Sequence, residues 1–297
     1  MRLPAIILGV ALLSAFRASS AETIQIPNGS FESPATTFAS PFIDSWQKTS
    51  KPDWYNDDGG TFQWTQLTGQ FSNQPPSYID NCDAKQAAWM FAVPEVGLFQ
   101  DYDYPTNHAF NAIYEVGRKY RLTVGLMGGA GGGLLEGVTF ELALYYRDAA
   151  SNTVIVAATT VTNSSSVFSN HTHLVDFYAD SAFVTSSDPW ANQHIGVRLL
   201  SSITDTNLEG GYWDLDNVRL TATPAATLTN PAWTNGQLSF VIQSDPGLIF
   251  EIQKATNLES TPIWSSIGNI TNDSGTNLFI DANATSGQSY YRAQLTR

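Results

Sequence analysis

Apolar and polar residues alternate along most of this chain, and that period of two restricts the fold more than any other feature. The alternation is clear in 120–128, YRLTVGLMG, and recurs in 138–147, 173–179 and 194–200. A period of two with one apolar face is typical of half-buried antiparallel strands. The chain shows no amphipathic helix longer than one or two turns. The sequence therefore predicts an all-β fold, an antiparallel jelly-roll β-sandwich.

A polar, proline-containing segment interrupts the alternation at 221–236, TATPAATLTNPAWTNG. New short alternating runs follow it, which indicates a second, smaller β-domain. We expect four parts, namely a signal peptide at 1–21, a jelly-roll domain at 22–222, a linker at 223–236 and a small β-sandwich-like accessory domain at 237–297.

Residues 1–21 have the pattern of a signal peptide rather than of a buried helix. Arg2 precedes a short apolar stretch, and small residues end at Ala21, so cleavage is expected before Glu22. No later stretch is long and apolar enough to cross a bilayer. The sequence predicts an exported protein, either secreted or periplasmic.

The charge of the chain limits its partners. The formal net charge is −13, with 14 Lys and Arg residues. Nucleic acid and anionic membranes need basic surface, so both are disfavoured as partners. The excess of acidic over basic residues instead favours divalent cations and neutral ligands as partners. The one cysteine, Cys82, precludes an internal disulfide, and we expect it to be a buried, inert thiol.

The run YWDLDNVRL, 212–220, places Asp214, Asp216 and Asn217 inside an alternating strand. Asp and Asn are depleted in strands, and burying an unpaired carboxylate is costly. A metal ion, a basic partner, solvent or a ligand must therefore compensate these carboxylates.

The order of these motifs resembles a family of exported jelly-roll modules. IPNGSFESP at 26–34, GLFQDY at 97–102, GRKYRLTVGL at 117–126 and YWDLDNVRLTA at 212–222 match the "N-x-x-F-E" opening and "D-N-V-x-L" ending of galactose-binding-like modules. That group includes calcium-containing carbohydrate-binding modules of bacteria, the Stig cyclases and related uncharacterised bacterial proteins. The resemblance covers about residues 24–222 and implies the fold more firmly than the activity.

The resemblance implies a structural calcium that joins the first and last strands. Its ligands would be Glu32, Asp216, Asp83 and the carbonyls of Ser30 and Gln86, although it is open whether Asp214 or Asp216 is the ligand in the last strand. Calcium takes six to eight oxygen ligands and mixes carboxylates with carbonyls. The alternative is that Asp214 and Asp216 face solvent or pair with an arginine.

The polar face of the predicted strands suggests a groove that binds sugar. Aromatic faces stack on pyranose rings, while charged and amide groups bind hydroxyls. Trp46, Trp89 and Trp213 are expected in the core. The candidate ligand-binding residues are Trp54, Tyr55, Trp64, Glu141, Tyr145, Arg147 and Trp190.

The sequence leaves three functions open. The favoured one is a non-catalytic protein that binds a glycan or polysaccharide. The second is an enzyme, either like the Stig cyclases or active on glycans, in which a groove carboxylate acts as an acid; Asp214 and Glu141 are the candidates. The third is a structural protein of the cell surface or matrix. A binder predicts lost retention on polysaccharide when Trp54 or Trp64 is replaced.

The end of the chain has its own resemblance. The runs ATNL at 255–258 and YYR at 290–292 look like the small β-domain that ends many exported proteins of Verrucomicrobia-type bacteria. The resemblance implies an accessory role, with possible association with the cell surface.

Overall fold

The described residues form two compact units, which meet in the sequence between Thr223 and Pro224. The computed structural model describes residues 21–59, 62–75, 78–105, 107–128, 133–169, 171–258, 262–284 and 288–296. Apart from Ala21, the predicted signal peptide lies outside these residues. Within them, no helix has the length and apolar character needed to cross a membrane.

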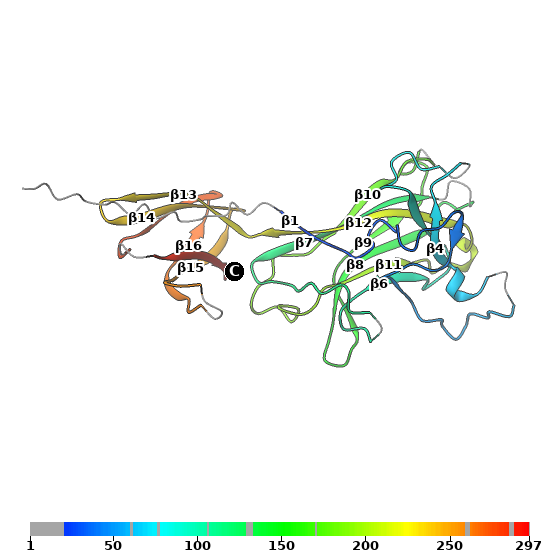
Figure 1. The fold of residues 1–297 in the computed structure, drawn as a ribbon, viewed down its shortest axis with the longest axis horizontal. Helices are drawn as coiled ribbons and strands as arrows, with labels where there is room; N and C mark the ends of the chain where they lie inside the picture. Colours follow the sequence, from blue (N-terminus) through cyan, green and yellow to red (C-terminus); the bar gives the residue numbers. More distant parts are fainter. Residues whose placement is uncertain are drawn as a thin grey trace, which may run out of the picture. The chain divides into compact units, whose positions relative to one another are not determined.

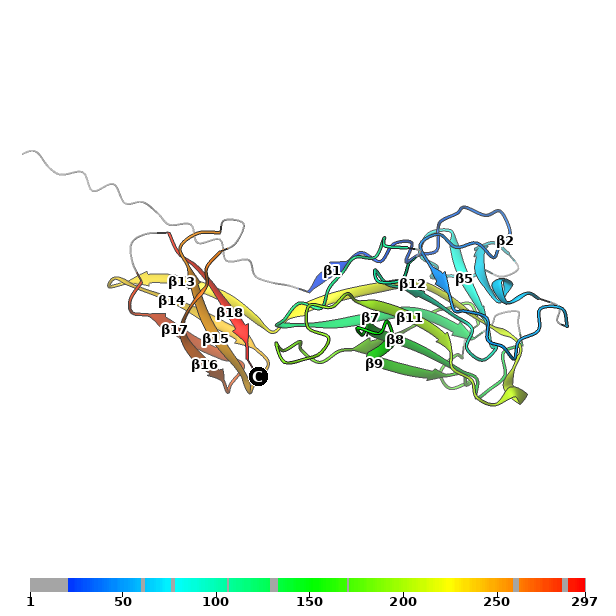
Figure 2. The ribbon, with the colours of Figure 1, turned by 90° about the horizontal axis from the view of Figure 1, so that it is seen from below.

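Two antiparallel sheets make up the first unit (Figure 1, Figure 2). The larger sheet has the order β10 (Val175–Asp180), β7 (Arg118–Gly128), β12 (Tyr212–Pro224), β5 (Gln86–Phe91), β4 (Thr68–Ser72) and β2 (Ala39–Ser40), with β1 (Glu22–Ile24) also paired with β12. The smaller sheet has the order β3 (Gln47–Lys48), β6 (Gly97–Gln100), β11 (Gly196–Ser201), β8 (Thr139–Arg147) and β9 (Thr153–Thr162). Two short 3₁₀ helices, η1 (Trp64–Gln66) and η2 (Thr206–Leu208), lie in the connections. The predicted all-β sandwich is confirmed.

The core lies between the two sheets and is built from the alternating residues. Leu122 of β7, Phe140 of β8 and Trp213 of β12 are all fully buried. Because successive side chains of a strand point to opposite faces, the burial of Trp213 and Leu215 directs Asp214 and Asp216 to the outer face of β12. Trp46 and Trp213 lie in the core, as expected.

The two ends of the first unit meet in one sheet. β1 pairs antiparallel with the end of β12, with Glu22 opposite Ala222 and Ile24 opposite Leu220. Segments almost two hundred residues apart in the sequence are therefore neighbours. The Val218 amide also donates to the Gly29 carbonyl at 2.8 Å, so the opening motif lies beside the closing strand.

The second unit consists of two three-stranded sheets, with Phe240 and Phe250 fully buried. The sheets have the orders β13 (Ala226–Thr234), β14 (Gln237–Ser244), β17 (Thr276–Asp281) and β16 (Ser265–Asn272), β15 (Leu248–Ala255), β18 (Tyr290–Leu295). The prediction of a linker at 223–236 is wrong over most of its length, because β13 occupies it. The pairing of β13 shifts register between Thr229 and Ala232, where Asn230 has a positive φ of 50°. This bulge accommodates Pro231 and shifts the alternation of polar and apolar residues, so the sequence of β13 does not show a regular strand pattern.

Candidate functional site

A cavity of about 400 Å³ opens on the outer face of the larger sheet, over β12, β5, β4 and β2. Two cross-strand pairs form its floor, with Tyr212 opposite Phe91 and Asp214 opposite Trp89. Directly opposed residues of paired strands share one face, so these four side chains point together into the cavity. Its lining consists of Thr37, Phe38, Ala39, Ser40, Pro41, Phe62, Gln66, Phe71, Ser72, Gln74, Pro75, Trp89, Phe91, Tyr212 and Asp214.

A glycine on β4 makes room for the indole of Trp89. Gly69 lies opposite Trp89 in the ladder, and a Cβ atom placed on it would lie 2.2 Å from Trp89 ring carbons and 2.5 Å from the Ser40 carbonyl. The Trp89 Nε1 donates to the Gln66 carbonyl at 3.4 Å. Because residue 69 has no side chain, the indole of Trp89 can pack against the sheet, where it forms a wall of the cavity.

We expect Gly69→Ala to destabilise the protein by about 1–3 kcal/mol, because the added methyl group overpacks against Trp89. Denaturant unfolding measures the loss. The same substitution in a Trp89→Leu background is expected to cost less, since the ring that it meets is gone and only the close contact with the Ser40 carbonyl remains. An equal loss in both backgrounds would contradict this role of the glycine.

The lining is mostly apolar and aromatic, with one charged residue among the described side chains, Asp214. Asp214 is 2% exposed. Burial raises the pKa of the neighbouring Tyr212, and the charge of Asp214 raises it further. Phe62, Phe91 and Tyr212 form a chain of rings with centroids 5.0 and 5.8 Å apart. The described lining thus offers aromatic and apolar surfaces with one carboxyl group among them.

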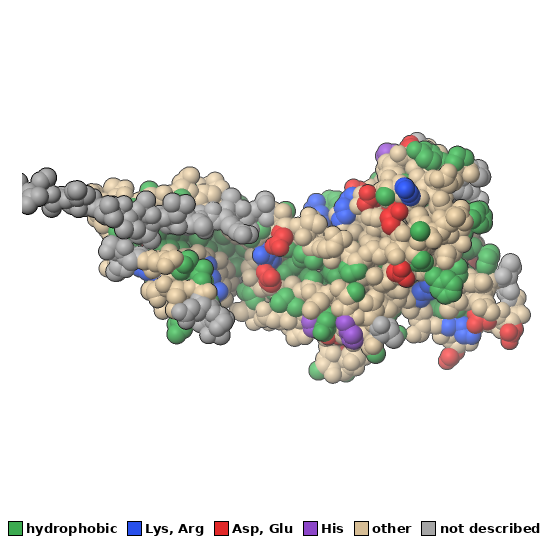
Figure 3. Space-filling model, in the orientation of Figure 1, with side chains coloured by type: hydrophobic (Ala, Val, Ile, Leu, Met, Phe, Trp, Pro, Cys, Tyr) green, Lys and Arg blue, Asp and Glu red, His purple; other side chains and the backbone are tan. Residues whose placement is uncertain are grey.

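Exposed aromatic side chains lie in the segment that forms the mouth of the cavity. Phe38 is 83% exposed and Phe42 is 74% exposed. Figure 3 shows hydrophobic side chains at the surface of the end of the first unit where β2 and β4 lie. The apolar character of the cavity therefore extends to its rim.

The residues proposed for calcium lie together in the fold. The Ser30 hydroxyl donates to Asp83 Oδ2 at 2.6 Å, and the Asp83 amide donates to Asp216 Oδ2 at 2.6 Å. Glu32 Oε1 accepts from the amides of Lys85 and Gln86 at 2.8 and 2.7 Å. The fold thus joins the opening motif, the middle segment and the closing strand.

Asp216 is fully buried in this cluster. Burial raises the pKa of Asp216 to about 7, against the opposing effect of hydrogen bonds from the amides of Asp83 and Asn217 and from the Cys82 thiol. Burial, together with the charges of Asp216, Glu32 and Asp83, raises the pKa of Cys82 far above its ordinary value. Cys82 is half-buried, and this shift agrees with an inert thiol.

The donor chemistry of the cluster fits a hard cation. Glu32, Asp83 and Asp216 supply carboxylate oxygens, and in the part of the chain that the structure describes none of them forms an ion pair with a basic side chain. Within those same residues, no group of three or more His, Cys, Asp or Glu side chains is arranged to hold a metal. A calcium site here would therefore need carbonyl or water oxygens beside the carboxylates.

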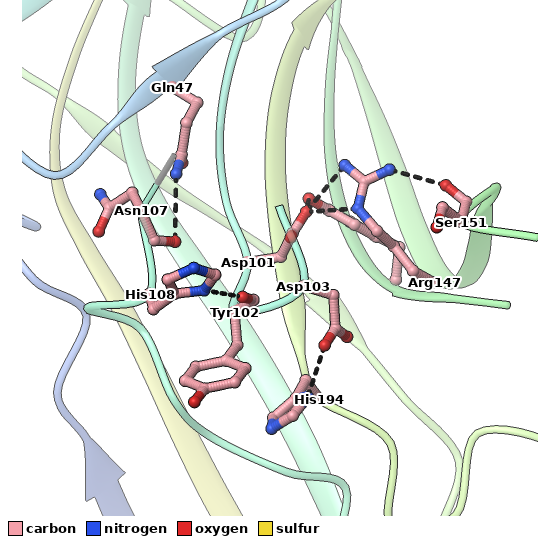
Figure 4. A network of polar contacts seen from close by, with 10 residues as sticks. Gln47, Asp101, Tyr102, Asp103, Asn107, His108, Arg147, Ser151 and His194 are labelled. Atoms are coloured by element: carbon pink, nitrogen blue, oxygen red, sulfur yellow. Dashed lines mark hydrogen bonds and ion pairs between the residues drawn. The ribbon is translucent and has the colours of Figure 1, made fainter. Parts of the chain in front are cut away.

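The candidate sugar-binding residues of the smaller sheet are engaged with one another. Glu141 accepts from Arg198 at 2.6 Å. The Tyr145 hydroxyl donates to Asp101. Arg147 forms an ion pair with Asp101 at 3.0 Å (Figure 4). Tyr145 is 1% exposed. The segment after β6 covers this part of the outer face, which the local alternation of β8 does not reveal.

The candidate aromatic residues divide between surface and interior. Trp54 is 50% exposed and lies edge-on to Tyr55 and Trp64. Trp64 is 5% exposed, and its Nε1 donates to the Thr49 carbonyl at 2.7 Å. Trp190 packs edge-on against Tyr114 with centroids 5.0 Å apart. Of these, Trp54 presents the most ring surface to solvent.

Asp214 and Glu141 lie on different sheets. Asp214 faces the cavity on the outer side of the larger sheet, whereas Glu141 pairs with Arg198 on the smaller sheet. The hydrophobic core separates the two faces. The two carboxyl groups therefore do not flank one bond, and this excludes a glycosidase-type pair made of these residues.

Sequence reasoning missed most of the cavity. Trp89 was expected in the core, but it is partly exposed and lines the cavity. The signal was present in 86–91, QAAWMF, where Trp89 and Phe91 alternate with the buried Met90. Phe38, Phe62 and Phe71 come from the irregular segment, where no periodicity assigns a face.

Solved structures share this fold. A cyclase from Fischerella sp. in its apo form is 24% identical, with a TM-score of 0.50, and the match covers 70% of this chain and 99% of that one. A Stig cyclase, Fisc, from Fischerella sp. TAU in complex with (3Z)-3-(1-methyl-2-pyrrolidinylidene)-3H-indole is 22% identical, with a TM-score of 0.50 and coverage of 69% and 99%. The tandem CBM22 domains of Xyn10C from Paenibacillus barcinonensis are 11% identical, cover 95% and 92%, and have a TM-score of 0.40, too low to carry an argument.

No curated protein matches the chain. The family model HpiC1-like, described as HpiC1 cyclase, matches residues 22–221, which is the whole of the first unit's sandwich and about two thirds of the chain. The expected relationship to jelly-roll modules that include the Stig cyclases is thereby confirmed, and the chain belongs to the HpiC1-like family.

Proposed function

We propose that this protein is a cyclase-type enzyme that binds an apolar, aromatic small molecule in the cavity of the larger sheet. Asp214 would act there as the proton donor. The observation that carries the proposal is the buried carboxyl group of Asp214 among aromatic side chains, in a chain of the HpiC1-like family. Among the three functions left open by the sequence, this supports the cyclase-like enzyme.

The chemistry of the cavity suits acid catalysis. Asp214 is a buried carboxyl group that faces the cavity, and a carboxyl group within reach of a bound ligand can act as its general acid. The faces of Trp89, Phe91 and Tyr212 carry negative electrostatic potential and favour positive charge that develops on the protonated ligand.

Glycan binding has weaker support. It requires ring faces and free polar groups in one groove, but Trp64 and Tyr145 are buried, and Glu141 and Arg147 are engaged in ion pairs. Trp54 remains an exposed candidate. Loss of retention on an insoluble polysaccharide when Trp54 is replaced by alanine would favour this function over the enzyme.

We also propose that calcium stabilises the first unit, with Glu32 and Asp216 as carboxylate ligands and Asp83, Ser30 and Gln86 beside them. The oxygen-rich cluster and the lack of basic partners among its described residues support this. A divalent ion would offset the repulsion between carboxylates and tie β12 to the opening motif. Export from the cell and surface association through the second unit stay predictions.

Binding of 4-(1H-indol-3-yl)butan-2-one, the compound bound in a cyclase from Fischerella sp. TAU, tests the ligand class. We expect saturable binding to the protein by isothermal titration calorimetry. In Ala39→Trp, the new ring would fill the cavity from the edge strand β2, where Ala39 is exposed, so the fold should persist while binding is lost. Unchanged binding in this variant would place the compound elsewhere.

A further inference from the structure

Lys48 reaches out of the smaller sheet and under the rim of the cavity. It lies on β3, the edge strand of that sheet. Its Nζ donates to the carbonyls of Pro41 at 2.6 Å and Thr68 at 2.7 Å, and also to the carbonyl of Thr65. One ammonium group therefore joins three points of the chain that are up to 27 residues apart.

Each of the three carbonyls belongs to a wall of the cavity or adjoins one. Pro41 lines the cavity itself, and the Thr65 carbonyl precedes the lining residue Gln66 in η1. Thr68 begins β4, which carries Phe71. The wall made by η1 in turn holds Trp89 through the Gln66 carbonyl.

The geometry requires an ammonium group. Three carbonyl oxygens need three donors, and a protonated lysine supplies three N–H bonds with no acceptor. Lys48 is half-buried, and this burial lowers its pKa to about 8. The three carbonyl dipoles take the place of water around the ammonium group, and removing it would leave them without their donor.

We propose that Lys48 is a positioning residue for the ligand site, because its ammonium group fixes the segment at Pro41, η1 and the start of β4 as one rigid wall. This inference rests on the proposed function. Lys48 does not line the cavity, so it acts through the walls rather than by touching the ligand.

The test measures binding of 4-(1H-indol-3-yl)butan-2-one to the full chain and to Lys48→Ala, with propylammonium or propan-1-ol added. We expect Lys48→Ala to raise the dissociation constant at least about tenfold, since the walls lose a shared donor. Propylammonium should restore affinity by replacing the missing part of the side chain and its charge. Propan-1-ol fills the same space with a single donor and should not restore it.

Two further variants keep the outcome decisive. Lys48→Met preserves the alkyl stem but has no donors. It should therefore bind the compound at least about tenfold more weakly than the wild type, like Lys48→Ala. Lys51→Met removes a nearby exposed ammonium that pairs with Asp57 at 2.8 Å, and its affinity should stay that of the wild type. Unchanged affinity in Lys48→Met, or equal rescue by the alcohol and the amine, would overturn the inference. Absence of binding to the wild type would instead refute the proposed ligand class.

Discussion

Replacing Asp214 with asparagine is expected to lower turnover about 10²–10⁴-fold while the protein still folds and binds its ligand. Asparagine has nearly the same shape, so it preserves the packing against Trp89 and Tyr212, but it has no acidic proton to deliver. Conversion of an indole-bearing substrate to its cyclised product, followed by liquid chromatography and mass spectrometry, measures the loss. Binding of 4-(1H-indol-3-yl)butan-2-one measures what remains of the site.

Glu141→Gln is the matched control for this substitution. Glu141 lies on the smaller sheet and pairs with Arg198, so its replacement should leave turnover near that of the wild type. Turnover that survives in Asp214→Asn, or that is lost in Glu141→Gln with the fold intact, would contradict the assignment of Asp214 as the acid.

Removal of calcium is expected to lower the melting temperature of the full chain by about 5–10 °C. A ligand present at a hundredfold excess over its dissociation constant stabilises the folded state by about 2.7 kcal/mol. In a unit of about 200 residues, each kcal/mol shifts the melting temperature by about 2–4 °C. Scanning calorimetry in excess calcium and then in EDTA measures the difference, and Asp216→Asn and Glu32→Ala should each abolish it.

The calcium-free protein is expected to lose stability as the pH rises from about 4 to 7. The pKa of Asp216 is about 7 in the folded protein and 3.8 ordinarily, so between these values the folded state holds the extra proton. A folded state that binds more protons than the unfolded state becomes less stable with rising pH. The full pKa shift of Asp216 corresponds to about 4 kcal/mol of folding stability, and this loss is complete above pH 7.

Asp216→Asn should flatten this pH dependence when unfolding is measured in EDTA. In the wild type, added calcium should stabilise more at pH 8 than at pH 5, because the ion binds the ionised carboxylate. An EDTA effect that persists in Asp216→Asn, or no response of the wild type to calcium at pH 8, would contradict the proposed site.

The sandwich is predictable from the sequence because its strands are long and their faces differ. In β7 and β8 every second residue is buried, and the same rule on β12 directs Asp214 and Asp216 outward. The second unit is predictable for the same reason, except for β13. There a bulge at Asn230 and Pro231 shifts the alternation, so a paired strand has the composition of a linker.

The ligand site is less predictable because long-range contacts build it. Phe38 and Phe62 reach the cavity from irregular segments whose paths depend on contacts such as the Lys48 ammonium. Conversely, Tyr145 has the sequence context of an exposed strand residue, but the segment at Asp101 covers it. Glu32, Asp83 and Asp216 are far apart in the sequence, so no local pattern relates them. Only the resemblance to a family motif predicts that they form a cluster.

The most direct test of the central claim is a crystal structure of the protein soaked with 4-(1H-indol-3-yl)butan-2-one. We predict that the indole lies in the cavity of the larger sheet, against Trp89 and the rings of Phe91 and Tyr212, with Asp214 facing the compound. Density for the compound at Trp54 or on the face of Glu141 and Arg147, with the cavity left unfilled, would contradict it.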